Sequence, residues 1–526
     1  MDPRRTIRRG LALMTVAGLA GALLATPAAG GERAGDDRAG GPAAPPAWAA
    51  CPDDLVTPVP LECATVQVPL DYDEPDGRQI EVVISRLAST DPGKRAGVLL
   101  LNPGGPGGSG LTQPAEMANL GMPDSVLDRY DLIGMDPRGV GKSSPVTCGF
   151  TADQPYMGNI PPYAPDAEAV AEHAEVARQI AAQCAEHDTD GRMRHMTTAN
   201  TARDIDRIRE LLGEEKLSFY GASYGSALGS AFATLFPDTS DRVIVDSNLG
   251  ATSLDRDSHR RFGLGMEKRF PDFARWVAAR HDTYELGRTP AQVRAGFLEL
   301  AAQLDEAPVA GVDGALFRAV GFGGLYTEAR FGITAQLWQG LTDSDESAVR
   351  ARLRDLEDVQ PEVGGLPAVA STRGAASEPS PYDNAWSSYL AVTCNDTDWP
   401  EDVATYQRDT AVDRKRYPLF GGAGANITPC AFWHNDPVDP ELEISDEGPG
   451  NVLVLQNLRD PATPHAGGVL AREQFGDRAR LVSVDAGEHG VYVYDDNACA
   501  LNTTTRFLLT GELPRTDVFC AHALSS

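Results

Sequence analysis

Two glycines flank a serine in the segment Gly221-Ala-Ser-Tyr-Gly225, which follows the apolar run 217–220 and precedes a stretch of small residues. This G-x-S-x-G pattern is typical of a nucleophilic serine held on a strained turn between a strand and a helix. The glycines are needed there because the two elements approach closely. A Gly-Ser turn alone would be weak evidence. In this context the pattern predicts that Ser223 is a nucleophile.

A serine hydroxyl needs a histidine to take its proton and a carboxylate to orient that histidine. Both follow Ser223 in the chain order that serine α/β-hydrolases use. Asp460 lies in a loop with two prolines after the apolar run 452–455, and His489 lies between glycines after the run 480–484. We therefore predict the catalytic triad Ser223, Asp460 and His489.

Hydrolysis of an acyl bond also needs donors for the oxyanion. The glycine-rich segment 102–110 follows the apolar run 97–101, so Gly104 and Gly105 are candidates, and the amide that follows the nucleophile, Tyr224, is the third. A phosphate-binding loop is the alternative, but the segment lacks a G-K-[ST] ending. Asp136 and Arg138, which follow the run 131–135, are expected to brace this loop.

Eight short apolar runs could supply the sheet that positions these loops. Several are almost purely apolar, as parallel strands covered on both faces are. Their order predicts an α/β fold of the α/β-hydrolase type, an eight-stranded, mostly parallel sheet with an inserted helical cap. The runs are 64–70, 80–87, 97–101, 131–135, 216–220, 242–246, 452–455 and 480–484.

Helical patterns fill the space between these runs. A helix is expected over 201–212, with Thr201 and Asp204 able to cap its start. We expect the core in two parts, 51–254 and 386–526, on either side of a helical cap at 255–385. Within the cap we expect helices at 271–279, 290–304 and 345–359 and a loop at 364–381. The cap is expected to contact substrate, and a purely structural bundle is the alternative.

The formal net charge of the chain is −29. Nucleic acid is therefore an unsuitable partner, while an acidic, solvated surface is common in exported proteins. The sequence has no C-x-x-C or H-E-x-x-H motif, so we expect no metal and no cofactor.

The first thirty residues carry four arginines, then an apolar run over 11–24, then small residues. This order predicts a signal peptide at 1–30 and a secreted protein without a permanent membrane anchor. The sequence leaves the export route open. Residues 31–50 are expected to form a disordered leader or propeptide, with the fold starting near Cys51.

Eight cysteines in an exported chain predict disulfides. They fall into four local couples along the sequence, and pairing within each couple is the simplest of the many possible connectivities. The expected pairs are Cys51 with Cys63, Cys148 with Cys184, Cys394 with Cys430, and Cys499 with Cys520.

Five segments together carry a family resemblance: 102–110, 136–141, 196–204, 221–225 and 459–464. In this order they resemble the secreted bacterial tripeptidyl aminopeptidases and related cell-envelope proteases of the α/β-hydrolase superfamily, over nearly the whole chain after residue 50. The resemblance implies that Ser223, Asp460 and His489 form the triad. It also implies that a cap restricts the site to the N-terminal ends of peptides.

Selection of chain ends requires a carboxylate that pairs with a free ammonium group. The resemblance makes Glu267 a candidate for this role, with a solvated helix glutamate as the alternative and Asp255, Asp257 and Glu328 as rivals. The segment 246–250 departs from the Asn-Pro or Asp-Pro ending that is common in the family, which bears on end specificity and not on the triad.

The expected function is a secreted serine exopeptidase. It would release short peptides, tripeptides in particular, from free N-termini through an acyl-enzyme. One alternative is an esterase or amide hydrolase that acts on a small metabolite with the same triad, because the motifs serve both reactions. A binding protein that has lost catalysis is the other. The expected partner is a peptide or a small amide or ester, and the sequence does not set the oligomeric state.

Overall fold

The computed structural model describes residues 45–522, except for 152–153, 155–157, 159 and 360–378. The expected signal peptide, most of the expected leader and most of the expected loop at 364–381 lie outside the described residues. In the part described, no helix has the length and apolar character of a membrane span.

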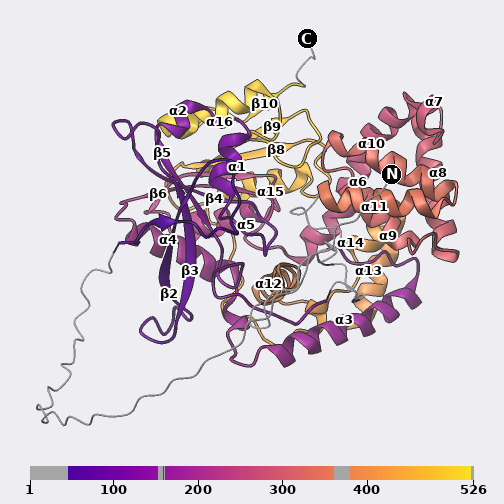
Figure 1. Cartoon of the computed structure of the whole chain (residues 1–526), viewed down its shortest axis with the longest axis horizontal. Coiled ribbons are helices and arrows are strands. Elements are labelled where there is room, and N and C mark those ends of the chain that lie inside the picture. The colour runs from indigo at the N-terminus through magenta and orange to yellow at the C-terminus, as the bar shows by residue number, and fades with distance from the viewer. Residues whose placement is uncertain (1–44, 152–153, 155–157, 159, 360–378, 523–526) are drawn as a thin grey trace, which may run out of the picture. The chain divides into compact units, whose positions relative to one another are not determined.

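One ten-stranded sheet runs through the described chain in the order β1-β2-β3-β5-β4-β6-β7-β8-β9-β10. All eight expected strands are present, and the sheet gains the short strands β1 and β10. Figure 1 shows that this one sheet contains strands from distant parts of the sequence, the indigo strands β2 and β3 and the yellow strands β8 and β9. The strands are β1 (Ala49–Ala50), β2 (Glu62–Pro69), β3 (Gln79–Leu87), β4 (Gly97–Asn102), β5 (Tyr130–Met135), β6 (Leu217–Ala222), β7 (Ser240–Asp246), β8 (Val452–Asn457), β9 (Ala479–Val484) and β10 (Val518–Cys520).

The sheet is mostly parallel. Strands β1, β2 and β3 pair antiparallel, and β3 pairs antiparallel with β5. All pairings from β5 through β10 are parallel. The carboxyl ends of the central strands therefore share one edge of the sheet, which is where this class of sheet places its functional loops.

Strand β1 corrects the expected start of the fold. Ala49 and Ala50 pair with Cys63 and Glu62, and the guanidinium of Arg86 lies 4.4 Å from the ring centre of Trp48. A tryptophan offers a large apolar surface and a cation-binding face. The last residues of the expected leader therefore belong to the folded domain.

Alternating side chains from the strands enter two different apolar clusters. Val98 and Leu100 of β4 lie in one cluster, while Leu99 and Leu101 lie in the other. All six residues of β4 are buried. Because successive strand residues point to opposite faces, the sheet is covered on both sides.

The helices confirm the alternation expected of an α/β fold. They are α1 (Gln113–Asn119), α2 (Asp124–Leu127), α3 (Ala167–His187), α4 (Thr198–Leu211), α5 (Tyr224–Leu235), α6 (Arg256–Ala278), α7 (His281–Tyr284), α8 (Pro290–Glu306), α9 (Gly314–Gly323), α10 (Phe331–Thr342), α11 (Glu346–Val359), α12 (Pro381–Asp396), α13 (Val403–Arg416), α14 (Gly421–Gly424), α15 (His465–Phe475) and α16 (Ala498–Thr510). Four short 3-10 turns lie at 193–195, 328–330, 429–432 and 476–478.

The start of α4 was predicted wrongly. The helix begins at Thr198, and the Thr197 side chain caps it by accepting a hydrogen bond from the Asn200 amide. Asp204, which we expected to serve as a cap, is fully buried and binds the Arg138 guanidinium. Both residues named as caps therefore lie inside the helix.

Helices α6 to α14 lie between β7 and β8 in the sequence. We expected a helix to begin at Pro271. Helix α6 instead begins at Arg256 and continues through that proline. Helices α6, α8, α9 and α10 share an apolar cluster, which also contains Phe420 next to α14, Tyr163 before α3 and Ala462 of the Asp460 loop. Tyr389 and its neighbours in α12 belong instead to the cluster of the sheet. The expected cap boundary at residue 385 stays a prediction.

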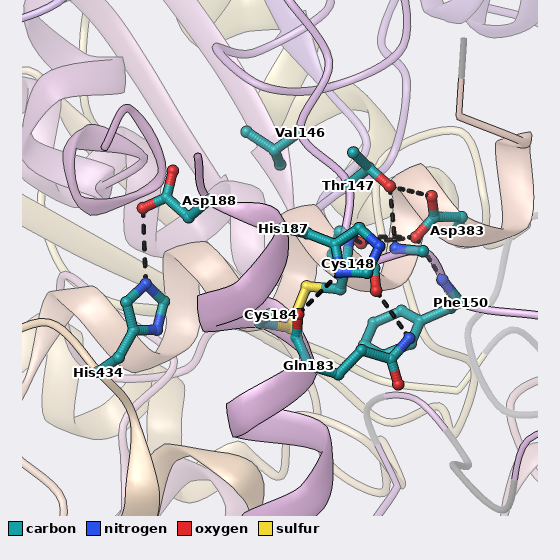
Figure 2. Close-up of a disulfide and its surroundings, with 12 residues drawn as sticks. Val146, Thr147, Cys148, Phe150, Gln183, Cys184, His187, Asp188, Asp383 and His434 are labelled. Carbon is teal, nitrogen blue, oxygen red and sulfur yellow. Dashed lines mark hydrogen bonds and ion pairs between the residues drawn. A yellow bond between two sulfur atoms is a disulfide. The ribbon is translucent and has the colours of Figure 1, made fainter. Parts of the chain in front are cut away.

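The structure forms the four cysteine pairs expected from the sequence. Figure 2 shows the Cys148–Cys184 disulfide, which joins the segment after β5 to α3. Beside it, Asp383 of α12 accepts hydrogen bonds from the Thr147 hydroxyl and from the Phe150 amide, the latter at 2.8 Å. This cluster fixes the start of α12 against the sheet domain.

Candidate active site

Ser223 lies on the turn between β6 and α5. Its φ of 60° and ψ of −125° are strained for a residue with a side chain. A Cβ on Gly221 would lie 2.2 Å from the Gly225 carbonyl oxygen. Any other residue at position 221 would therefore clash with the last glycine of the motif. The strained serine and the close strand-helix approach are those that the motif predicted.

The glycine-rich loop after β4 packs against this turn. A Cβ on Gly104 would lie 3.0 Å from the Ser223 Cβ and 3.1 Å from the Tyr224 nitrogen. The Gly104 amide donates to the Asn102 Oδ1 at 3.0 Å, so it is already used. Neither the Gly105 amide nor the Tyr224 amide has a hydrogen-bond acceptor among the described residues. Of the three candidate donors, these two are free to bind an oxyanion.

Asp460 and His489 form a close pair. The His489 Nδ1 lies 2.9 Å from Oδ2 and 3.0 Å from Oδ1 of the Asp460 carboxylate. This carboxylate is fully buried and accepts further hydrogen bonds from the Ala462 and Thr463 amides and from the Thr463 hydroxyl. Such a set of donors holds the carboxylate in one orientation, as a residue that orients an imidazole requires.

Two opposing effects act on the His489 imidazole. Burial of the ring lowers its pKa, and the Asp460 carboxylate raises it by more, so that the pKa of His489 lies above its usual value of 6.5. The imidazolium that forms during proton transfer is thus stabilised.

The residues at the end of β7 bind both the turn that carries Ser223 and the loop that carries His489. The Ser223 amide donates to the Asp246 carbonyl oxygen at 3.0 Å. The next residue, Ser247, accepts from the Gly490 amide at 2.9 Å. Ser223, and Gly490 next to His489, therefore bind the same two-residue segment, Asp246-Ser247.

The Asp246 carboxylate also holds the histidine loop. It is fully buried and accepts from the Val491 and Tyr492 amides and from the Tyr220 hydroxyl. Burial raises the pKa of Asp246 to about 6, although these donors act in the opposite direction. The sequence analysis placed this residue after a strand but gave it no role in positioning the site.

A second buried group lies behind Tyr224. The Tyr224 hydroxyl is 2.6 Å from the Thr198 hydroxyl, which donates to Asp396 at 2.6 Å. Burial raises the pKa of Asp396 to about 7. This chain fixes the first residue of α5, whose amide is one of the two free donors, and no local motif signals it.

The helical insertion contacts the histidine loop directly. The His489 amide donates to the Tyr326 carbonyl oxygen at 2.9 Å, and the two rings meet edge to face with their centres 5.0 Å apart. The Glu328 amide donates to the Glu488 carboxylate at 3.1 Å. Sequence analysis missed Tyr326, because nothing in the spacing of a helical segment indicates which turn meets the histidine.

Two arginines strengthen the same contact. Arg269 of α6 is nearly buried and binds Asp272 at 2.8 Å and Glu488 at 3.5 Å. Arg459, beside Asp460, binds Asp272 at 2.8 Å. A Cβ at Gly487 would lie 2.0 Å from the Arg269 guanidinium, so this glycine makes room for the arginine.

Glu267 lies in the helical insertion and binds there. Its carboxylate is 2.9 Å from the Arg294 guanidinium and accepts from the Leu419 amide at 3.1 Å. Gly265, two residues earlier in α6, packs against the Pro461 carbonyl oxygen beside Asp460. Because residues two apart on a helix point in nearly opposite directions, the structure does not bring Glu267 to the triad.

Asp136 and Arg138 have separate contacts. Asp136 accepts from the Ser109 hydroxyl at 2.5 Å and so braces the glycine-rich loop, as expected. Arg138 is fully buried and binds Asp204 at 2.6 Å and the carbonyl oxygens of Pro69 and Leu70. Arg138 therefore joins α4 to the end of β2 and does not brace the loop.

The described residues contain no cluster of three or more histidine, cysteine, aspartate or glutamate side chains suited to a metal ion. The arrangement around Ser223 has the groups that acyl transfer requires. It combines a strained serine, a histidine held by a buried carboxylate, and two free amides beside the serine.

Two family models match the chain. A model described as "alpha/beta hydrolase fold" matches residues 97–319. A model described as "TAP-like protein" matches residues 417–520, which contain Asp460 and His489. Together the matches cover the nucleophile, the glycine-rich loop and the acid and histidine loops.

Several curated proteins are similar over most of the chain. A protein of Streptomyces lividans named "Tripeptidyl aminopeptidase" is 35% identical over 90% of this chain and 86% of its own. A protein of Mycobacterium tuberculosis named "Serine protease Hip1" is 29% identical over 87% of each chain. Another, named "Carboxylesterase B", is 30% identical over 87% of this chain and 86% of its own.

Proposed function

The chain belongs to the TAP-like family of α/β-hydrolases and is a serine hydrolase, and on this premise we propose that it is a secreted exopeptidase. It releases short peptides, tripeptides in particular, from the free N-termini of peptide substrates. Two relatives have names that refer to the cleavage of peptides or proteins, and this supports a peptide substrate. The four disulfides support an oxidising location outside the cytoplasm.

The proposed reaction begins with attack of the Ser223 hydroxyl on the peptide carbonyl. His489 takes the hydroxyl proton, and Asp460 stabilises the imidazolium that results. The Gly105 and Tyr224 amides receive the oxyanion, since the Gly104 amide is already bound to Asn102. His489 then gives its proton to the leaving amine, and water hydrolyses the acyl-enzyme by the same steps.

A single observation carries the proposal. Strained Ser223 binds Asp246 at the end of β7, and Gly490, the residue after the Asp460-paired His489, binds Ser247, so that the turn of the proposed nucleophile and the loop of its proposed base share one support. Such an arrangement serves acyl transfer. The choice of a peptide over an ester depends on the relatives and not on this geometry.

The experiment compares three substrates: a tripeptidyl 4-nitroanilide with a free amine, its N-acetylated form, and an unactivated short-chain alkyl ester. The proposal expects kcat/KM for the free amine to exceed that for the acetylated form at least about a hundredfold, because a buried carboxylate left without its ammonium partner is costly. Equal rates on both anilides would contradict an exopeptidase. The Ser223→Ala variant measures background hydrolysis.

An esterase is the second candidate, and the relative named "Carboxylesterase B" favours it. The same triad and oxyanion donors would then act on an ester with a neutral acyl group. Preference for the alkyl ester over the free-amine anilide would support this candidate and contradict the exopeptidase.

A further inference from the structure

A cavity of about 260 Å³ lies between α3, α6, α12 and the segment 427–430. Its wall includes Val176, Ala177, Leu390 and Ile427, and none of the described residues that line it is an aspartate, glutamate, lysine or arginine. An engineered apolar cavity of about 150 Å³ is large enough to bind benzene. This space can therefore hold an aromatic or branched aliphatic group.

A few polar groups interrupt this apolar wall. His259 binds the Tyr389 hydroxyl through Nε2 at 2.9 Å, and burial lowers the pKa of His259 to about 4, so the ring is neutral. The His259 Nδ1 and the Thr428 hydroxyl are buried and have no hydrogen-bond partner among the described residues. Buried polar atoms are rarely left unpaired. Unpaired atoms on the wall of a cavity indicate a site that takes a neutral ligand.

The cavity lies next to the part of α12 on which the glycine-rich loop packs. Gly107 of the glycine-rich loop packs on α12, where a Cβ would lie 2.4 Å from the Ala385 carbonyl oxygen and 3.1 Å from the Tyr389 nitrogen. Tyr389 itself lines the cavity. One turn of α12, from Ala385 to Tyr389, thus contacts the glycine-rich loop and also contributes a residue to the wall of the cavity.

A row of aromatic rings connects the other side to the triad. It runs from His259 through Phe262, Phe322 and Tyr326 to His489, with successive ring centres 5.5, 5.5, 5.6 and 5.0 Å apart. The cavity therefore lies beside the packed rings that support the catalytic histidine.

We propose that this cavity receives one uncharged, apolar group from the acyl part of the substrate, the part that becomes bound to Ser223. In a peptide substrate this group is the side chain of one residue on the N-terminal side of the cleaved bond. The proposal rests on the proposed function for the identity of the substrate. A charged side chain is excluded, because the described wall has no carboxylate, lysine or arginine, and burial lowers the pKa of its two histidines, His173 and His259, so that both rings are neutral.

The test partly fills the cavity. Ala177 of α3 is buried and lines it, whereas Ala182 of the same helix is exposed. The variants Ala177→Leu and Ala182→Leu therefore add the same atoms inside and outside the cavity. Both are assayed with tripeptidyl anilides that carry phenylalanine or alanine at each of the three acyl positions in turn.

At one of the three positions, Ala177→Leu is expected to lower kcat/KM for phenylalanine at least about tenfold relative to alanine, since the added atoms take the space in which the aromatic ring would be buried. Ala182→Leu should leave this ratio within about twofold. An unchanged ratio at all three positions, in an Ala177→Leu enzyme that still cleaves the alanine substrate, would overturn the proposal.

Thr428→Val gives a second test if Ala177→Leu does not fold. The hydroxyl is replaced by a methyl group of similar size, so a substrate tyrosine should lose kcat/KM relative to phenylalanine by about threefold or more, the effect of one neutral hydrogen bond. An unchanged ratio in a folded variant would contradict the assigned occupant.

Failure of the proposed function can be recognised separately. If the wild-type enzyme cleaves no peptide, the exopeptidase fails, and calorimetry on Ser223→Ala with and without Ala177→Leu then tests the cavity. Binding of Ala-Ala-Phe, Ala-Phe-Ala or Phe-Ala-Ala that Ala177→Leu weakens about tenfold, with Ala-Ala-Ala unaffected, supports it. Binding that the substitution does not affect overturns it.

Discussion

The loops at the strand ends and the helical insertion contribute to the active site in different ways. In the loops, the functional side chains have several buried hydrogen bonds each, as at Asp460 and Asp246. The insertion is built around an apolar cluster that also takes in Ala462 of the Asp460 loop, and it contacts the His489 loop through a few residues, among them Tyr326 and Arg269. We infer from this contrast that the loops supply the reacting groups, while the insertion sets the position of the His489 loop and the space for substrate.

Loss of the Asp460 carboxylate should have the largest effect on the rate of hydrolysis. Asp460→Asn would no longer hold the correct imidazole tautomer, so kcat should fall on the order of 10³ to 10⁴-fold, as in other triads. Initial rates on the preferred substrate measure this. Asp485→Asn, a substitution of a partly exposed aspartate beside the same loop, should stay within about threefold. A comparable loss in both variants would contradict the triad.

The pH profile should report the same loop. His489 must be neutral to accept a proton, and its pKa lies above 6.5, so kcat/KM should fall about tenfold per pH unit below a midpoint that lies above pH 6.5. Two other buried groups of the site could titrate nearby, Asp246 with a pKa of about 6 and Asp396 with a pKa of about 7. In Asp246→Asn and in Asp396→Asn the midpoint should remain above 6.5. Loss of the acid limb in either variant would assign the titration to the residue replaced.

Separation of the insertion from the histidine loop should have a moderate effect. Arg269→Met removes the cation that joins Asp272 to Glu488. Because small displacements of a catalytic group are costly, kcat/KM should fall roughly tenfold, while active-site labelling still goes to completion. Arg275→Met, on the same helix and also bound to Asp272 but mostly exposed, is the matched control. Equal activity of both variants would mean that the insertion does not position His489.

A substitution far from the contact between the insertion and the His489 loop should have the smallest effect. Glu267 pairs with Arg294 within the insertion, so Glu267→Gln should change kcat/KM less than about threefold, as expected for a partly exposed ion pair. The ratio of free-amine to N-acetylated anilide hydrolysis should stay the same. A collapse of that ratio would assign the ammonium-binding role to Glu267 in spite of its present partner.

The same contrast explains what the sequence could predict. The eight main strands and the strained turn at Ser223 follow from local apolar runs and from glycines at fixed spacing. The cysteine pairs were predicted because the members of each pair are neighbours in sequence. Strand β1 was not predicted, since its two alanines acquire their structure only by pairing with β2.

The contacts between loops and insertion could not be predicted from local patterns. Tyr326 and Arg269 reach the histidine loop from helices that are distant in sequence, and their positions depend on how the insertion packs. Helix α6 continues through Pro271 because its apolar face is buried in the insertion cluster, and tertiary packing of this kind overrides local propensity. The role of Asp246 likewise depends on a loop more than two hundred residues away.

The most direct test of the central claim is labelling with a fluorophosphonate, followed by mass spectrometry of the peptides. Activation of Ser223 by His489 and Asp460 predicts one label per chain on the peptide that contains Ser223, slow labelling in Asp460→Asn, and none in Ser223→Ala. A label on another residue, or a wild-type enzyme that hydrolyses substrate but is never labelled, would contradict the account.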